Sequence, residues 1–189
     1  MEHSRKHIAD VLKQAAAYAF FRYGYSMSFE VGLKAWGSRR ADILGNKING
    51  DLVLLEVKSS VADFRSDTKW HEYLDYADRV YLVFTKEVAR KIHDEPELKA
   101  RIPKRVGVMV LEDYGYTRVV KNAQRVDVDP KLRMLTLARL AWRQGELSKR
   151  TTRARKRFFL GDKIVAPNET IRKVRFRKKR RYTARSKRK

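Results

Sequence analysis

The stretch RRADILGNKINGDLVLLEVKSS, residues 39–60, decides the fold. It predicts two strands, over residues 39–46 and 52–58, joined by a turn at Asn49-Gly50, which is a strong hairpin signal. The second strand is almost continuously apolar, which favours a central strand covered on both faces. It nevertheless encloses Glu56 and ends at Lys58, and a buried carboxylate or ammonium group is costly unless something pairs with it.

The length of the hairpin loop determines whether Asp42 joins Glu56 and Lys58 on one face of the sheet. Side chains alternate faces along a strand, so Glu56 and Lys58 point the same way. A three-residue loop over residues 48–50 would place Asp42 across from Glu56. A two-residue loop over residues 49–50 would turn Asp42 to the opposite face. The sequence leaves both loops open, although three-residue loops with a left-handed glycine are a standard hairpin type.

In the three-residue register, Asp42 and Glu56 would have Cβ atoms roughly 4.5–5.5 Å apart. Carboxylates that close repel each other unless one takes a proton or a cation lies between them. Hard oxygen ligands suit Mg²⁺ or Mn²⁺, and Lys58 beside such an ion would complete the equipment for phosphodiester hydrolysis. The alternative is structural: Glu56 and Lys58 form an ion pair at the end of the sheet, and Asp42 is a turn residue.

The flanking sequence predicts a mixed α/β sheet flanked by helices. Residues 3–23 have the apolar spacing of an amphipathic helix that ends at Gly24. Further strands are predicted over residues 27–33, 80–85, 106–111 and, at the edge of the sheet, 118–120. Further helices are predicted over residues 70–77, over 87–101 with a break at Pro96, and from Asp129 to about Gln144. Trp70 and Tyr73 are expected to pack in the core, with base stacking as the alternative.

The charge of the chain is concentrated at its C-terminus. The formal net charge is +23, and residues 149–189 alone carry 19 Lys and Arg against two acidic residues. An excess of this size indicates a polyanionic partner such as DNA or RNA. The sequence therefore predicts a nuclease-like core over residues 1–124, a helix within 125–148 and a basic nucleic-acid-binding tail over 149–189. The end of this tail is expected to be disordered without a ligand.

The composition also excludes several classes of protein. The chain has no cysteine, which excludes disulfides, thiolate zinc sites and cysteine nucleophiles. The N-terminal 25 residues carry too many charges for a signal peptide, and no apolar run approaches the roughly 20 residues that would span a membrane. We therefore expect a soluble cytoplasmic protein with no membrane partner.

The pattern of Asp42 followed by Glu56-Val57-Lys58, on a hairpin after an N-terminal helix, resembles the core of the PD-(D/E)XK nuclease superfamily. Over a longer span, the motifs RRAD, EVKSS, DFR, KW and YLDYADRVYLVF resemble the MmcB-related DNA repair proteins within it. The resemblance covers roughly residues 5–120. It implies a restriction-endonuclease-like αβββαβ core, a divalent metal ion and a DNA substrate, with residues 125–189 as a basic extension outside the family.

The resemblance also implies roles for individual residues. Asp42, Glu56 and the Val57 carbonyl group would hold Mg²⁺ or Mn²⁺, and Lys58 would be the catalytic lysine. Glu30 matches an acid that assists the metal in many members; its alternative is an exposed strand acid. In the segment after the third strand, Asp63 is expected to cap a helix, whereas Asp67 would cap the helix or contact the substrate. The basic residues expected to bind the substrate are Arg39, Arg40, Arg65, Lys69, Arg175, Arg177, Lys178, Lys179, Arg180 and Arg181.

These features together predict a Mg²⁺- or Mn²⁺-dependent deoxyribonuclease, with endonucleolytic cleavage, in DNA repair or in the DNA processing of a phage or mobile element. The alternative is a non-catalytic nucleic-acid-binding protein that retains the nuclease fold. A structural protein that packs nucleic acid is a third interpretation. DNA is the expected partner, RNA is an alternative partner, and a homodimer is a further expectation.

Overall fold

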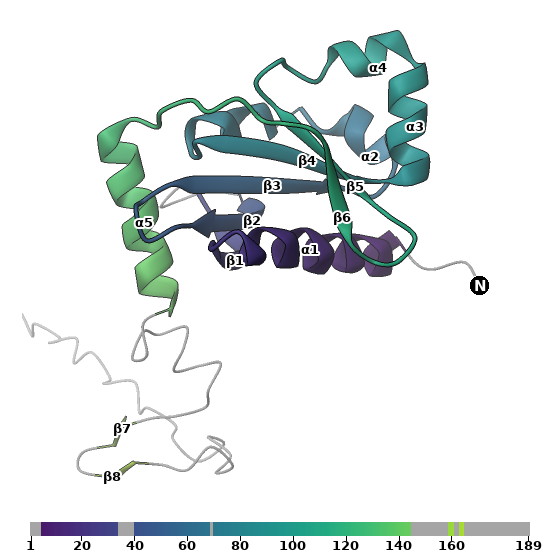
Figure 1. Cartoon of the computed structure of the whole chain (residues 1–189). Helices are drawn as coiled ribbons and strands as arrows, with labels where there is room; N and C mark the ends of the chain where they lie inside the picture. Colours follow the sequence, from purple (N-terminus) through teal and green to yellow (C-terminus); the bar gives the residue numbers. More distant parts are fainter. Residues whose placement is uncertain (1–4, 34–39, 69, 145–158, 161–162, 165–189) are drawn as a thin grey trace, which may run out of the picture. The chain divides into compact units, whose positions relative to one another are not determined.

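A computed structural model describes residues 5–33, 40–68, 70–144, 159–160 and 163–164 (Figure 1). The chain divides into two compact units, Met1–Ala141 and Trp142–Lys189. In the described part of the second unit, the strands β7 (Phe159–Leu160) and β8 (Lys163–Ile164) pair antiparallel. Within the described residues, no helix has the length and apolar character needed to cross a lipid bilayer.

The first unit is built on a six-stranded mixed sheet whose strands follow one another in chain order. Its first three strands are antiparallel, β3 to β5 run parallel, and β6 returns antiparallel at the edge. The strands are β1 (Ser26–Gly32), β2 (Arg40–Asn46), β3 (Leu52–Lys58), β4 (Arg79–Thr85), β5 (Gly107–Leu111) and β6 (Thr117–Lys121). Every residue of β3 is buried, so the predicted central strand is confirmed.

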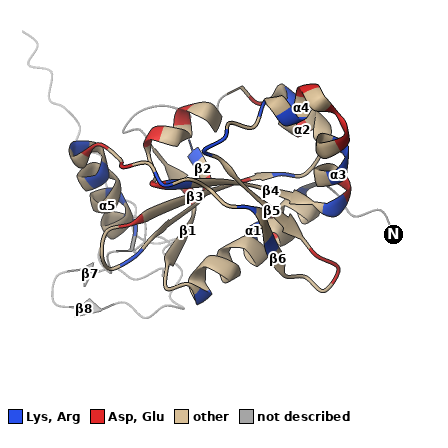
Figure 2. Cartoon of the chain, turned by 45° about the horizontal axis from the view of Figure 1, so that its top comes forward, with Lys and Arg blue, Asp and Glu red and all other residues tan. Residues whose placement is uncertain are grey.

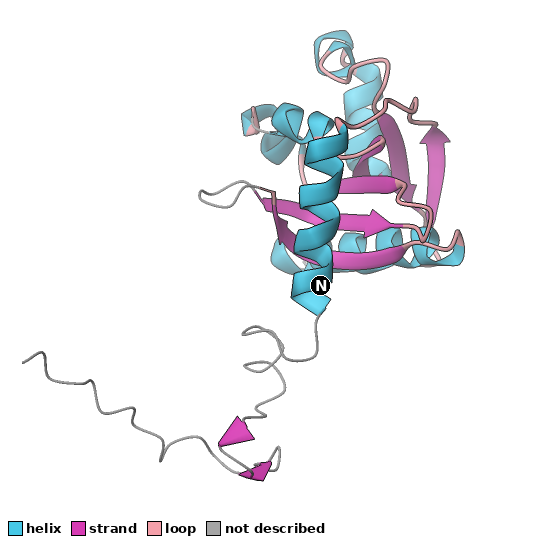
Figure 3. Cartoon of the chain, turned by 90° about the vertical axis from the view of Figure 1, so that its left-hand side faces the viewer, coloured by secondary structure: helices cyan, strands magenta, loops and turns pink. Residues whose placement is uncertain are grey.

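Helices cover both faces of this sheet. The helices are α1 (Arg5–Arg22), α2 (Val61–Ser66), the 3₁₀ helix η1 (Trp70–Asp75), α3 (Lys86–Asp94), α4 (Pro96–Ala100) and α5 (Pro130–Gln144). Figure 3, turned so that α5 faces the viewer, shows helices on both sides of the strands. The element order begins α1-β1-β2-β3-α2 and continues through η1 to β4, so the predicted αβββαβ core and mixed α/β class are confirmed.

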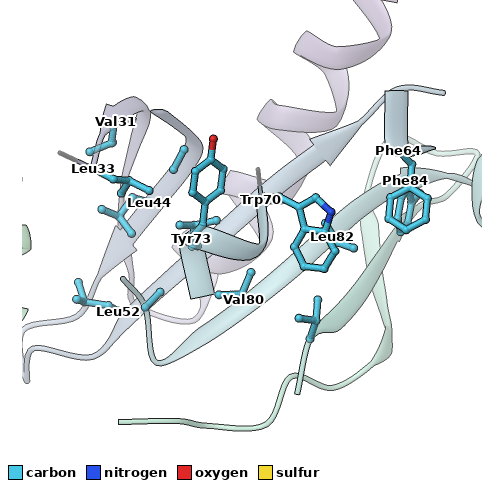
Figure 4. Packing of buried hydrophobic residues seen from close by; sticks show 14 of the residues in the cluster. Val31, Leu33, Leu44, Leu52, Phe64, Trp70, Tyr73, Val80, Leu82 and Phe84 are labelled. Carbon is cyan, nitrogen blue, oxygen red and sulfur yellow. The ribbon is translucent and has the colours of Figure 1, made fainter. Parts of the chain in front are cut away.

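Two apolar clusters hold these layers together. On one face, Leu12, Ala16 and Phe20 of α1 pack against alternate residues of β2 to β5, which include Ile43 and Leu55. On the other face, residues of α2, η1, α3 and α5 pack against the intervening residues of the strands. Figure 4 shows the second cluster. Burying both faces in this way explains why β3 reads as a continuous apolar run.

The hairpin between β2 and β3 has the three-residue loop. Lys47 and Asp51 close it through a 2.9 Å hydrogen bond from the Lys47 N–H group to the Asp51 carbonyl oxygen. Gly50 in the loop has a φ of +86°, the left-handed conformation that glycine adopts without strain. Ile43 therefore pairs with Leu55, and Leu44 pairs with Leu54. This register brings Asp42 beside Glu56, although Ala41 before it and Ile43 after it pack on opposite faces of the sheet.

The segment after α2 differs from its predicted form. The apolar spacing of residues 70–77 predicted an α-helix, whereas the chain forms the short 3₁₀ helix η1. Trp70 and Tyr73 are nevertheless buried in the cluster of Figure 4, so the predicted core packing is confirmed. A 3₁₀ helix aligns residues three apart, so the same pair of rings reaches the core from a tighter helix.

The helix α5 is tied to the sheet by a buried ion pair. Asp78, which is 1% exposed, accepts hydrogen bonds from Arg133 of α5 at 2.6 and 2.7 Å and from the Leu52 N–H group at 2.7 Å. Burial opposes the charged carboxylate, but the hydrogen bonds from Arg133 and Leu52 hold the pKa of Asp78 below its ordinary value. Lys and Arg supply the charges of α5, whereas α3 and α4 carry both signs (Figure 2).

Candidate active site

The candidate site lies where β2 separates from β3. The backbone ladder between these strands extends to the pair Ile43 and Leu55, while β2 stays paired with β1 as far as Arg40. Beyond that point side chains bridge the gap: the Asp42 carboxylate accepts a 2.9 Å hydrogen bond from the Val57 N–H group. The Glu56 carboxylate lies 3.4 Å from the Asp42 backbone nitrogen. The two acids thus face each other across a fork in the sheet, as the three-residue register predicts.

Lys58 joins this pair from the same face of β3. Its Nζ atom lies 3.1 Å from Glu56 Oε1 and also donates to the carboxylate of Asp67, the residue after α2. The side chains of Glu56 and Lys58 are 8% and 4% exposed, so this ion pair is buried. The ion pair between Glu56 and Lys58 that the structural interpretation expected therefore forms. Asp42, however, is a residue of β2 and not a turn residue.

The electrostatics of the fork follow from burial and crowding. Burial and the neighbouring charge of Asp42 raise the pKa of Glu56 to about 7, although Lys58 favours its charged form. Burial opposes the charge of Lys58, but Glu56 and Asp67 more than compensate and raise its pKa above the ordinary value. The fork therefore holds carboxylates and ammonium groups close together in a place where water is largely excluded.

The helix α1 contributes a second ammonium group, which the sequence did not predict. The Nζ atom of Lys13 lies 2.8 Å from Asp42 Oδ1 and also pairs with Glu30 of β1. Glu30 is paired in addition with Arg40 at 2.6 Å, and its backbone φ of +53° is unusual for a residue other than glycine. Glu30 is thus placed beside the fork, with Lys13 between it and Asp42.

Two residues of the segment after β3 complete the surroundings of the fork. Asp67 contacts Lys58, as described above, so it lies at the site itself. Tyr73 is buried, and its hydroxyl points away from the apolar cluster in Figure 4. Burial raises the pKa of Tyr73, and the charges of Glu56 and Asp67 add to this effect. Tyr73 therefore lies within electrostatic reach of the fork, which its helical spacing did not indicate.

The structure places the other predicted residues as follows. Asp63 belongs to the start of α2: Ser60 is the N-cap, its hydroxyl accepts from the Asp63 N–H group at 3.1 Å, and the Asp63 carboxylate accepts from the Ser59 N–H group at 3.0 Å. Arg65 is exposed and pairs with Glu95. The remaining residues predicted to bind the substrate lie outside the described residues: Arg39, Lys69, Arg175, Arg177, Lys178, Lys179, Arg180 and Arg181.

The donor atoms of the fork are compatible with one type of metal site. Among the described residues, no three His, Cys, Asp or Glu side chains lie close enough together to hold a metal ion. Asp42 and Glu56 supply two carboxylates, and proteins commonly hold Mg²⁺ through one or two carboxylates while waters complete its shell. The donor set therefore fits a hydrated Mg²⁺ or Mn²⁺ ion better than an ion enclosed by protein ligands.

Comparison with solved structures shows a related fold. A protein of unknown function from Silicibacter pomeroyi is 23% identical with a TM-score of 0.59, and the match covers 75% of this chain and 86% of that one. A repair endonuclease from Pyrococcus abyssi is 19% identical with a TM-score of 0.26, and the match covers 50% of this chain and 45% of that one. No curated protein matches the sequence.

The family comparison covers most of the chain. A family model described as DNA repair protein MmcB-like matches residues 3–153. The match includes the fork, the sheet and α5, and it extends beyond the limit of about residue 120 that the sequence motifs indicated. The expectation that the family ends before residue 125 is therefore wrong for α5, and this helix is part of the family's common unit. The chain belongs to the MmcB-like family of DNA repair proteins.

Proposed function

We propose that the protein is a Mg²⁺- or Mn²⁺-dependent deoxyribonuclease that cleaves DNA internally during repair. The observation that carries the proposal is the meeting of Asp42, Glu56 and Lys58 at the fork between β2 and β3. Membership of a family of DNA repair proteins supports DNA as the substrate.

Each residue of the fork has a role in this proposal. Asp42, Glu56 and the Val57 carbonyl group would hold the metal ion, which would supply positive charge to stabilise a phosphate under attack. The Lys58 ammonium has three N–H donors, two of which serve Glu56 and Asp67. Its third donor would orient the attacking water or hold a phosphate oxygen. Glu30 would assist from β1.

The charge of the chain supports the choice of a polyanionic substrate. The net charge of +23 favours attraction to DNA independently of sequence, because each phosphate contact releases counterions. Arg40 and Arg65, both on the surface of the first unit, would contact the substrate backbone after leaving their present acidic partners. The basic tail would add affinity for DNA. RNA carries the same phosphate charge and is the alternative partner.

A second candidate is a nucleic-acid-binding protein of this family that performs no hydrolysis. It is favoured by the ammonium groups that already neutralise the fork: Lys13 pairs with Asp42, and Lys58 pairs with Glu56. In this candidate the fork serves stability, and DNA binding rests on the basic surface and the tail alone.

Cleavage of a supercoiled circular plasmid with Mg²⁺ or Mn²⁺ separates the two candidates. A nuclease nicks the circle, whereas Asp42→Asn and Glu56→Gln are expected to reduce the rate by about 100-fold or more through loss of a metal ligand. Glu87→Gln, at an exposed position of α3, is the matched control and should cleave normally. Equal cleavage by the two site variants and the native protein contradicts the proposal, and tight binding without nicking favours the second candidate.

A further inference from the structure

The outer side of α1 carries large aromatic side chains that the fold leaves in contact with solvent. Tyr18 and Phe21 are each 63% exposed, and Tyr23, just after the helix, is 66% exposed. Tyr116, from the segment before β6, is 54% exposed. Isolated exposed rings are ordinary, but four from neighbouring positions indicate a binding surface.

These rings border two hollows that share Tyr18 as their common wall. The first hollow, of about 620 Å³, lies between α1 and β1 and is lined by residues that include Gln14, Phe21, Ser26 and Met27. The second, of about 320 Å³, is lined by residues that include Tyr23 and Tyr116. The rings of Tyr18 and Phe21 are stacked with their centroids 6.4 Å apart. We call this surface the aromatic groove.

The aromatic groove leads to the candidate active site. Its lining on α1 includes Ala17, which is one helical turn, or about 6 Å, beyond Lys13. Its lining on β1 includes Met27, which is three residues, or about 10 Å, before Glu30. Because Lys13 and Glu30 pair with each other at the fork, the end of the groove at Ala17 and Met27 lies next to the fork.

The chemistry of the groove selects a partner with flat apolar faces and negative charge. Among the described residues, Arg22 is the one charged side chain that lines either hollow, and no carboxylate does so. The bases of an unpaired strand stack on aromatic rings whatever their sequence, and its phosphates are attracted by Arg22 and by the net charge of +23. A protein partner would meet the same rings, but it would not explain their continuity with a site for phosphate chemistry.

We propose that the aromatic groove binds unpaired nucleotides and so directs the enzyme to DNA with a single-stranded segment. The inference rests on the proposed function for the identity of the nucleic acid, and it adds the substrate class that the fork alone does not specify. Tyr18 is the central stacking residue because it faces both hollows.

Binding without divalent metal tests the groove separately from cleavage. Fluorescence anisotropy in EDTA would compare a labelled single-stranded oligonucleotide with the same sequence as a duplex. The double variant Tyr18→Ala/Phe21→Ala is expected to lose about tenfold or more in affinity for the single strand, because each stacked base contributes about 1–3 kcal/mol. Its affinity for the duplex should stay within about twofold of the native value. The variant Tyr18→Phe keeps a ring and should bind as the native protein does.

Tyr114→Ala is the matched control, since Tyr114 is 91% exposed and lines neither hollow. Equal single-strand binding by the double variant and the native protein overturns the inference. Loss of self-association in sedimentation, with single-strand affinity unchanged, also overturns it and assigns the groove to contact between two copies. Selective loss of single-strand binding in a protein that nicks no plasmid would uphold the groove and remove only the proposed nuclease.

Discussion

The Lys13 ammonium lies 2.8 Å from the Asp42 carboxylate. The helix α1, which covers one face of the sheet, therefore contacts Asp42, whose neighbours Ala41 and Ile43 pack on opposite faces. Lys13 also pairs with Glu30, and it therefore holds α1, β1 and β2 together at the fork. In that position it is a resident cation at the place proposed for a divalent one.

Replacing Lys13 with methionine should change metal affinity and stability in opposite directions. Lys13→Met removes the competing charge, and the affinity for Mn²⁺ should rise about fivefold, which corresponds to about 1 kcal/mol. The metal-free protein should lose about 1–2 kcal/mol in its free energy of unfolding, because Asp42 and Glu30 lose their shared partner. Calorimetric titration with Mn²⁺ and urea unfolding in EDTA measure the two effects. Lys104→Met, at an exposed position, is the control, and an unchanged or lower Mn²⁺ affinity would contradict the prediction.

Asp67→Asn tests how Lys58 is positioned. The variant keeps the size of the side chain but weakens the second of the two carboxylate contacts that orient the ammonium. We expect the cleavage rate at saturating DNA to fall about 10–100-fold, the range seen when a supporting contact of an active site is lost. The apparent KM should change little. Asp94→Asn, on the exposed end of α3, is the control; a normal rate in Asp67→Asn would show that Glu56 alone is sufficient to hold Lys58.

The Asp78–Arg133 pair should make the stability of the first unit dependent on pH. Because the pKa of Asp78 is lowered in the folded protein, the unfolded chain takes up its proton at higher pH. The contribution of the pair is therefore complete above about pH 4, the ordinary range for aspartate, and is lost as the pH falls further. Asp78→Asn should cost about 3 kcal/mol at pH 7 and flatten the fall in stability below pH 4.

Urea midpoints measured between about pH 2.5 and 7 would show this difference. Asp75→Asn is a suitable control, because Asp75 is largely exposed and its contact with Arg105 is long, at 4.0 Å. Parallel curves for native protein and Asp78→Asn would mean that the pair does not govern acid stability.

The basic tail should dominate the salt dependence of DNA affinity. Residues 149–189 carry 19 Lys and Arg, and log affinity falls against log salt with a slope of about 0.9 per phosphate neutralised. A chain ending at residue 148 should show a clearly shallower slope with the same duplex. Identical slopes for the full and shortened chains would mean that the first unit, and not the tail, makes the phosphate contacts.

The parts of the site that lie on the hairpin could be predicted from sequence, since local rules govern them. The loop length stayed open between two and three residues in the sequence; the three-residue loop that forms, with Gly50 in the left-handed conformation, brings Asp42 beside Glu56. The burial of Glu56 and Lys58 follows from the apolar run that surrounds them. Short-range periodicity was also sufficient for α3 and α4, which meet at Pro96 as predicted.

The contribution of Lys13 could not be predicted, because it depends on the angle at which α1 crosses the sheet. Its helical spacing marks it only as a residue beside the apolar stripe, and no local rule relates position 13 to position 42. The 3₁₀ form of η1 was missed for a different reason. Over two turns, rings at spacing three fit both kinds of helix, and the choice depends on how little chain separates Trp70 from the start of β4 at Arg79.

The fork has a consequence for how this protein can change. Where β2 and β3 part, the clasp between them is the Asp42 side chain on the Val57 N–H group and not another rung of backbone. The same carboxylate thus joins the two strands and is also the metal ligand of the proposed function. An asparagine at position 42 could still accept the hydrogen bond from Val57, so the proposed activity could be lost while the fold is kept. An apolar residue would lose both the hydrogen bond and the activity.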